Sequence, residues 1–293
     1  DQYLRFAAAK QMARPRMDEM RGSLDISICQ AVCGQLTGPV WSGSGGNPQL
    51  EPWLANAFDL SYEKYFTSEN GNKGYLSAAY FYKDLSTYIY KKDIEWDYSG
   101  YPLPPPGPGQ IPGVNYPTSD IGTINAPANG EGGSMSGLEL AVSVPFDVLW
   151  DPLQGFGMQA SYSDTDSSIS PNGPGTSEPL AGLSKYVSNI TLYYERYGFS
   201  ARFSQRSRSA FRAETRGFGA DLAYININGE TVQDAQINYS FNDGALENLT
   251  LFLQVSNIGD EPFTTSDGGD SAARPVQYFE YGRTTLLGFS YKF

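Results

Sequence analysis

The sequence predicts an all-β protein, an antiparallel transmembrane β-barrel with long extracellular loops and short periplasmic turns. Three observations predict it. Apolar and polar side chains alternate along ten segments, the connections between the segments are alternately long and short, and aromatic residues gather beside the short connections. No uninterrupted apolar run approaches the roughly 18 residues that a membrane-spanning helix needs.

The ten segments each have one apolar face and one polar face. In the fourth segment, Leu138, Leu140 and Val142 share one face, and the residues between them lie on the other. A period of two is the period of a β-strand, so we expect each segment to be a strand. In chain order the segments are 3–8, 58–63, 76–83, 137–146, 158–163, 189–195, 199–208, 234–242, 249–256 and 278–293.

The connections between the segments separate a membrane barrel from a soluble sandwich. Barrels of the outer-membrane type have long loops on one side of the membrane and short turns on the other. A soluble β-sandwich binding module, which also has alternating strands, has no physical reason to keep this order. Short turns are expected near 67–73, 150–155, 197–198 and 243–247, and long loops over roughly 13–53, 93–133, 169–184, 213–230 and 260–276.

Aromatic side chains gather beside the short turns and at the end of the chain. Trp, Tyr and Phe are enriched where a barrel meets the membrane–water interface. The sequence therefore predicts one aromatic girdle at this level, formed by Tyr65, Phe66, Phe146, Trp150, Phe156, Tyr193, Tyr194, Tyr197, Phe199, Tyr239, Phe241, Phe289, Tyr291 and Phe293.

The composition excludes several classes of function. The chain of 293 residues has 20 basic and 32 acidic side chains, a formal net charge of −12, so it has no basic stripe for nucleic acid. It contains no histidine, which removes the Ser-His and Cys-His pairs of many hydrolases and the usual ligands of zinc and haem. We therefore expect neither an enzyme nor a bound metal or cofactor.

The two cysteines lie four residues apart, at Cys29 and Cys33, within a predicted long loop. Without histidine or further cysteine, a zinc site is not expected. The sequence instead predicts a local disulfide formed in an oxidising compartment. So small a ring shapes a loop rather than holding a fold together.

Several motifs, in this order and spacing, resemble the C-terminal part of a TonB-dependent outer-membrane receptor. They are the segments 47–52, 74–84, 137–140, 257–263 and 282–293, the last with Gly288, Tyr291 and Phe293 in the positions of the family's assembly signal. The resemblance implies that residues 1–293 are the last ten strands of a probable 22-stranded barrel. The plug domain and the N-terminal strands are absent from this chain.

The same resemblance implies a function and partners. The protein would bind a scarce nutrient at the bacterial cell surface and import it across the outer membrane with energy supplied through TonB. Its partners would be the TonB complex, reached through a plug that is not in this chain, the barrel assembly machinery, outer-membrane lipid and lipopolysaccharide, and a small nutrient. A self-contained ten-stranded porin or adhesin without a plug is the alternative.

Two groups of residues are candidates for ligand contact. The long loops carry aromatic rings and many acids, which suit stacking on a carbohydrate or another neutral ligand. Charges on the polar strand faces must line the lumen, because a charge in lipid costs several kcal/mol. Lumenal arginines favour a siderophore-like anion, or form a network that seats a plug. The candidates are Trp41, Trp53, Trp96, Tyr98, Tyr101, Arg206 and Arg208.

Overall fold

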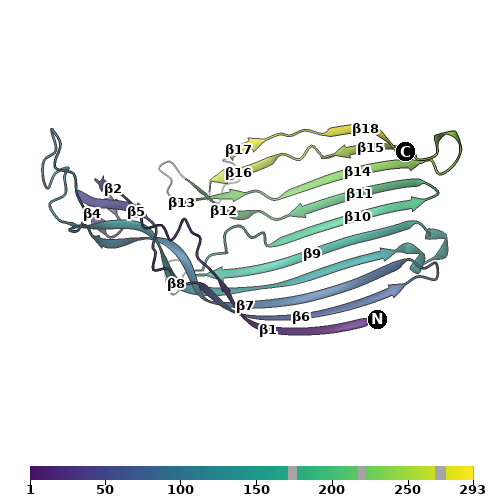
Figure 1. Ribbon diagram of the computed structural model, residues 1–293, viewed down its shortest axis with the longest axis horizontal. Coiled ribbons are helices and arrows are strands. Elements are labelled where there is room, and N and C mark those ends of the chain that lie inside the picture. Colours follow the sequence, from purple (N-terminus) through teal and green to yellow (C-terminus); the bar gives the residue numbers. More distant parts are fainter. Residues whose placement is uncertain (171–176, 217–221, 268–274, 293) are drawn as a thin grey trace.

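The computed structural model describes residues 1–170, 177–216, 222–267 and 275–292. Its main element is an antiparallel sheet in which ten strands follow one another (Figure 1). The last predicted segment, 278–293, forms a shorter wall strand than expected, because residues 278–279 lie in a different sheet. The all-β wall and its ten strands are confirmed. They are β1 (Gln2–Ala13), β6 (Trp53–Thr67), β7 (Lys73–Asp97), β8 (Ile121–Pro145), β9 (Phe156–Ile169), β10 (Tyr186–Arg196), β11 (Phe199–Arg208), β14 (Glu230–Ser240), β15 (Leu249–Ser256) and β18 (Thr284–Tyr291).

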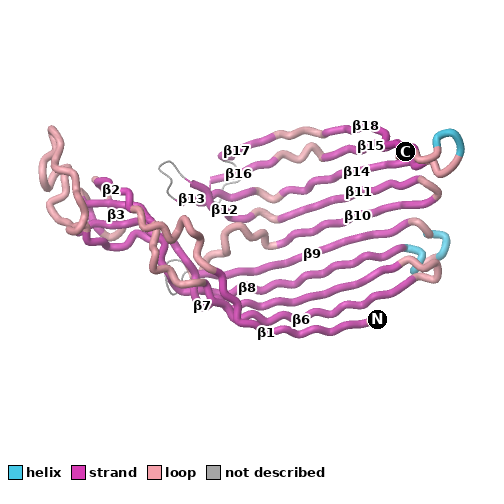
Figure 2. Tube along the Cα trace, in the orientation of Figure 1, coloured by secondary structure: helices cyan, strands magenta, loops and turns pink. Residues whose placement is uncertain are grey.

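Short turns join strand pairs at the end of the sheet where both chain termini lie (Figure 1). Three 3-10 helices lie in these turns: η1 (Phe146–Val148), η2 (Asp151–Leu153) and η3 (Gly244–Leu246), drawn in cyan in Figure 2. Among the described residues, no helix is long and apolar enough to cross a membrane.

One face of the sheet is an open apolar surface. The register places Phe6 beside Leu60, Leu60 beside Tyr80, and Tyr80 beside Leu138, so the row is continuous across four strands. Leu4 is 73% exposed and Phe6 70% exposed. A soluble sandwich would bury this face against a second sheet. Its exposure agrees instead with a face that lipid tails cover.

The aromatic girdle is present on the apolar face beside the turns. The rings of Phe156 and Tyr194 lie 4.4 Å apart, those of Tyr194 and Phe199 lie 6.0 Å apart, and Tyr239 pairs with Phe199 on the next strand. Tyr65 and Tyr193 differ from the prediction. They share the parity of the polar face, so they point away from lipid. Phe293 lies outside the described residues.

The long loops contain more regular structure than the sequence predicts. Strands β7 and β8 are each 25 residues long, although roughly 9–11 residues cross a membrane, so their outer halves project beyond it. On the outer half of β8, β5 (Val40–Gly45) pairs in parallel, and β2 (Leu24–Cys29) pairs with β5. We call this projection the lobe, formed by residues 14–52 with 86–132 (left in Figure 1).

Smaller strands complete the structure of the loops. Within the lobe, β3 (Val32–Cys33) and β4 (Leu36–Thr37) form a short hairpin. A separate four-stranded sheet lies beyond the ends of β11, β14, β15 and β18 that are far from the chain termini (Figure 1). It contains β12 (Phe211–Arg216), β13 (Leu222–Ile227), β16 (Phe263–Asp267) and β17 (Pro275–Phe279).

Many of the buried apolar side chains lie in the lobe. Trp41, Tyr98 and Ile124 are among the buried residues there. The packing is close because glycine lets backbones approach: a Cβ on Gly122 would overlap the backbone of Trp41. The lobe is therefore a packed body that stands on two long strands.

Candidate ligand-binding site

The polar face of β11 carries Arg202, Arg206 and Arg208, as the strand alternation predicts. Arg202 pairs with Glu195 at 2.5 Å, and Arg208 pairs with Glu230 at 3.2 Å. Arg206 lies between them in register with Asn189 and Val232, and it forms no salt bridge with any described residue. Most of the positive charge on this face is therefore already balanced.

Two further arginines of the chain are also paired with glutamates. Arg5 on β1 pairs with Glu63 on β6, and Arg212 on β12 pairs with Glu178. The guanidinium of Arg208 also lies 5.2 Å from the centre of the Phe211 ring, which fixes its position at the outer end of β11.

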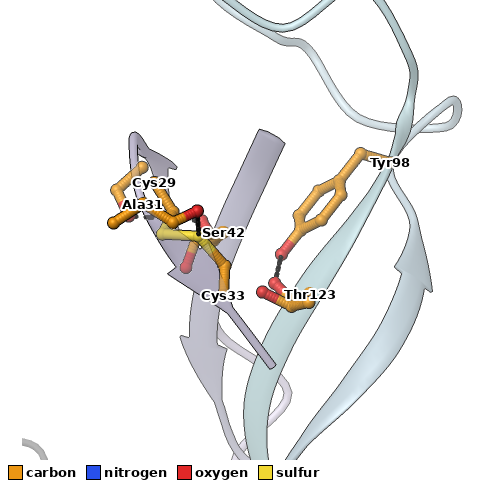
Figure 3. Close-up of a disulfide and its surroundings, with 7 residues drawn as sticks. Cys29, Ala31, Cys33, Ser42, Tyr98 and Thr123 are labelled. Carbon is orange, nitrogen blue, oxygen red and sulfur yellow. Dashed lines mark hydrogen bonds between the residues drawn. A yellow bond between two sulfur atoms is a disulfide. The ribbon is translucent and has the colours of Figure 1, made fainter. Parts of the chain in front are cut away.

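Two of the aromatic candidates are packed inside the lobe. Trp41 is 3% exposed and meets the ring of Tyr116 edge to face at 5.5 Å. Tyr98 is fully buried, and its hydroxyl donates a hydrogen bond of 2.7 Å to the carbonyl of Thr123 (Figure 3). Burial raises the pKa of Tyr98 to about 12, so the hydroxyl keeps its proton. The surfaces of both rings are taken up by the protein itself.

The other aromatic candidates keep part of their surface in solvent. Tyr101 is exposed and lies 5.8 Å from the ring of Tyr98. Trp53 packs on Tyr88 at 4.4 Å, at the base of the lobe. The indole N–H groups of Trp53 and Trp96 are buried and have no hydrogen-bond partner among the described residues. That ligand contact occurs at these residues stays a prediction.

Cys29 and Cys33 are joined in a disulfide within the lobe (Figure 3). The side chain of Gln30, inside the disulfide loop, donates a hydrogen bond of 2.7 Å to the carbonyl of Asn115. This bond connects the disulfide loop to the proline-rich loop that carries Tyr101 and Tyr116. In the described ranges, no group of three His, Cys, Asp or Glu side chains gathers as metal ligands would.

A carboxylate that the sequence analysis did not single out joins two short turns. Asp147 is 9% exposed, and its Oδ2 accepts hydrogen bonds from Ser68 (2.8 Å), Asn72 (2.8 Å) and Asn70 (3.2 Å). Burial would raise the pKa of Asp147, but these bonds outweigh it and hold the pKa below its ordinary value. In the sequence, the pattern Ser-x-Asn-x-Asn around Gly71 is the one sign that this turn offers several side-chain donors to a nearby acceptor.

The last described strand carries two of the three residues of the predicted assembly signal, and Phe293 lies outside the described residues. Gly288 lies opposite Phe252, where a Cβ would meet the phenylalanine ring, and Tyr291 pairs with Leu249. Both therefore lie in the last described strand, β18, where they form one edge of the sheet.

Known structures of similar shape are receptors. The siderophore receptor PirA from Acinetobacter baumannii has a TM-score of 0.62 and 16% identity, over 100% of this chain and 39% of that one. A mutant of the ferric enterobactin receptor PfeA from Pseudomonas aeruginosa, in complex with enterobactin, has a TM-score of 0.64 and 17% identity, over 98% of this chain and 38% of that one. The ferric-catecholate import receptor Fiu from K12 E. coli has a TM-score of 0.55 and 16% identity, over 98% of this chain and 32% of that one. No curated protein matches the sequence.

These likenesses concern the fold, because the identities are low. The chain spans less than two-fifths of the length of each of these structures. The sequence itself matches a family model: residues 1–258 match the family described as TonB dependent receptor-like, beta-barrel. The match covers most of the barrel wall described above. This chain therefore belongs to the TonB-dependent receptor β-barrel family, whose members are receptors for transport in the bacterial outer membrane rather than enzymes.

Proposed function

We propose that this chain forms the barrel wall and the lobe of a receptor that captures a scarce nutrient and imports it with energy supplied through TonB. The lobe carries partly exposed aromatic rings that a ligand could contact first, and the polar face of the sheet would line the lumen through which the ligand then passes. Coupling to the TonB complex would pass through a plug outside this chain.

The ligand class that the geometry supports best is an uncharged, hydroxyl-rich molecule such as a carbohydrate. The observation that carries this is the pairing of the lumenal arginines: Arg202 with Glu195, and Arg208 with Glu230. Paired charges attract an anion weakly, and the chain as a whole carries −12. Exposed aromatic faces such as Tyr101 stack well on sugar rings.

One observation favours a second candidate, a siderophore-like anion. Arg206 faces the lumen and lacks a salt bridge to any residue in the part of the chain that the structure describes. A single free guanidinium binds a carboxylate or phenolate oxygen readily. Relatives of the same fold are siderophore receptors, which is consistent with this candidate.

An uptake experiment separates the two candidates. A deletion strain carrying the full receptor is grown on a panel of oligosaccharides and, separately, on ferric siderophores as the sole iron source. For a carbohydrate receptor, Trp96→Ala lowers uptake at least several-fold with normal barrel yield, and Arg206→Gln has little effect. For a chelate receptor, Arg206→Gln lowers uptake and its neighbour Arg202→Gln does not. Growth unaffected by deletion on both panels would contradict the transport role.

Assembly belongs to the same proposal. We propose that Gly288, Tyr291 and Phe293 guide the terminal strand to the barrel assembly machinery and that the apolar face contacts outer-membrane lipid. Substitution of Phe293 should lower the amount of barrel in the membrane without changing ligand affinity in the barrel that does assemble. Normal barrel yield in this variant would remove Phe293 from the assembly role.

A further inference from the structure

The lipid-facing side of the sheet is interrupted by a patch of hydrogen-bonding side chains. On β11 this side is apolar at Phe199, Ala201 and Phe203, and then becomes polar at Gln205 and Ser207. The register places Gln205 beside Gln233 of β14 and Ser207 beside Thr231. We call these four residues the polar ladder.

The members of the polar ladder form hydrogen bonds with one another, and the two glutamines still have donors and acceptors that these bonds do not use. The Gln233 amide donates to the Gln205 carbonyl at 2.8 Å, and the hydroxyls of Ser207 and Thr231 lie 2.9 Å apart. Each glutamine amide has donors and an acceptor, so one bond between the two leaves a donor group and an acceptor unused. Polar groups against hydrocarbon are costly unless a partner satisfies them.

An apolar groove of about 540 Å³ lies on the same face, next to the polar ladder. This volume is within the range of small-molecule sites, roughly 300–1,000 Å³. Ser188 lines one end of the groove and is in register with Ser207, so groove and ladder are continuous. The groove is lined chiefly by Tyr62, Ala78, Leu140, Val142, Ala160 and Tyr162.

The ladder lies farther from the short turns than the inner end of the groove does. One row across the sheet runs from Leu76 through Val142, Ala160 and Ile190 to Gln205 and Gln233. At the groove end, Leu76 is three residues from the turn end of β7 (73 to 76). At the ladder end, Gln233 is seven residues from the turn end of β14 (233 to 240). The row therefore climbs toward the long loops.

This arrangement matches a lipid of the outer leaflet, with its chains nearer the membrane centre and its head nearer the outside. Asp164 and Asp166 of β9 lie on this face near the ladder, and Asp166 is paired with Lys185 at 3.2 Å. The carboxylate of Glu261 accepts a hydrogen bond from the backbone N–H of Thr231 in the ladder itself.

The unpaired cations that share this face among the described residues, Lys10, Lys64 and Arg196, lie away from the ladder, on β1 or beside the short turns. None of them is placed to bind a phosphate next to the ladder. Recognition must then come from hydrogen bonds to neutral groups.

We propose that the groove and the polar ladder form one site for an outer-leaflet glycolipid. An acyl chain lies in the groove, and the amide and hydroxyl groups next to the sugar head bond to Gln205 and Gln233. A phospholipid with ester-linked chains offers these side chains acceptors but no amide or hydroxyl donor at that depth. The site lies on the outside of the wall and is independent of the transported ligand.

Native mass spectrometry of the full receptor, titrated with purified lipid A or with phosphatidylethanolamine, tests the proposal. The double variant Gln205→Leu with Gln233→Leu removes the hydrogen-bonding groups but keeps the volume. The matched control is Gln236→Leu with Gln254→Leu, a pair that is also in register but lies on the polar face. We expect lipid A binding to fall at least tenfold in the outward pair and to be unchanged in the control pair.

A second variant keeps the test decisive where the double variant does not assemble. Ala160→Phe fills the groove without touching the ladder, and it should also lower lipid A binding at least several-fold while the heat-resistant barrel band persists. Equal lipid A binding in wild type and either assembled variant would overturn the proposal. Binding of phosphatidylethanolamine as strong as that of lipid A, with the same dependence on Gln205 and Gln233, would overturn it as well.

Discussion

At the scale of single residues, Asp147 concentrates three hydrogen bonds on one carboxylate oxygen and so ties the turn 67–73 to the turn that follows β8. Its folded-state pKa is lowered relative to an unfolded value of about 3.9. A lowered pKa contributes stability that is fully present above the unfolded value and is lost as the pH falls through the folded value. The contribution is therefore complete at neutral pH.

We predict that Asp147→Asn destabilises the full receptor at pH 7 by about 1–3 kcal/mol, because a neutral amide cannot accept the charge-assisted hydrogen bonds that the carboxylate receives from Ser68, Asn70 and Asn72. The difference from wild type should shrink as the pH falls below about 4 and vanish once Asp147 is protonated in the wild type. Thermal midpoints of the detergent-solubilised receptor, measured across pH, check this. A gap that stays constant down to the lowest pH would contradict the assigned role.

Tyr98 provides a second prediction at this scale. Tyr98→Phe removes the hydroxyl that satisfies the buried Thr123 carbonyl, which should cost about 1–3 kcal/mol within the lobe. We expect faster proteolysis of the lobe and an unchanged barrel. Tyr101→Phe is the control, since Tyr101 is exposed. Equal proteolysis rates for both variants would show that the hydrogen bond does not stabilise the lobe.

The burial of Trp41 and Tyr98 shows what the sequence could not predict about the site. Aromatic residues in a predicted loop look the same whether they face a ligand or pack inside the protein. The distinction here depends on β5 pairing in parallel with β8 across about 80 residues of sequence, as Ser42 does with Thr123. In contrast, the direction of Arg206 and Arg208 follows from local alternation, which the sequence displays.

At the scale of elements, strand alternation is a strong signal wherever one face meets lipid and the other meets water. The ten wall strands satisfy this condition and are predictable. The outer halves of β7 and β8 do not. Residues 121–133 of β8 include Pro127 and several glycines, which are poor strand formers, and their neighbours cover them on more than one side. Only tertiary packing makes this segment a strand.

The disulfide closes a short loop within the lobe, so its removal should affect the lobe and not the barrel wall. We predict that Cys29→Ser with Cys33→Ser increases proteolysis of the lobe and leaves the thermal midpoint of the barrel unchanged. The ring is short, so its effect should stay below the roughly 3 kcal/mol expected of a 15-residue loop. Gln30→Ala is an informative companion, because it removes the bond to Asn115 while keeping the disulfide. A lower barrel midpoint in the cysteine variant would show that the lobe supports the wall.

At the scale of the whole molecule, the sheet has two open edges. β1 pairs only with β6, and β18 pairs only with β15, among the strands that the structure describes. An open edge is not stable in hydrocarbon, because its backbone groups lack partners. We propose that both edges pair with further strands of a larger barrel. A self-contained ten-stranded porin would need β1 and β18 to pair with each other, which they do not do here.

The assignment of faces supplies the last prediction, which uses two adjacent residues. Leu60 lies on the apolar face beside Phe6 and Tyr80, and Ser61 lies on the polar face beside Arg5 and Ala79. Leu60→Arg should destabilise the assembled receptor by roughly 2–4 kcal/mol, because the charge would face lipid near the middle of the membrane. Ser61→Arg adds the same side chain to the lumen and should leave barrel yield close to that of wild type. Measurement of the heat-resistant barrel band in outer membranes compares the two. Equal yields would mean that lipid does not solvate the face that carries Leu60, and the membrane orientation of the whole sheet would be wrong.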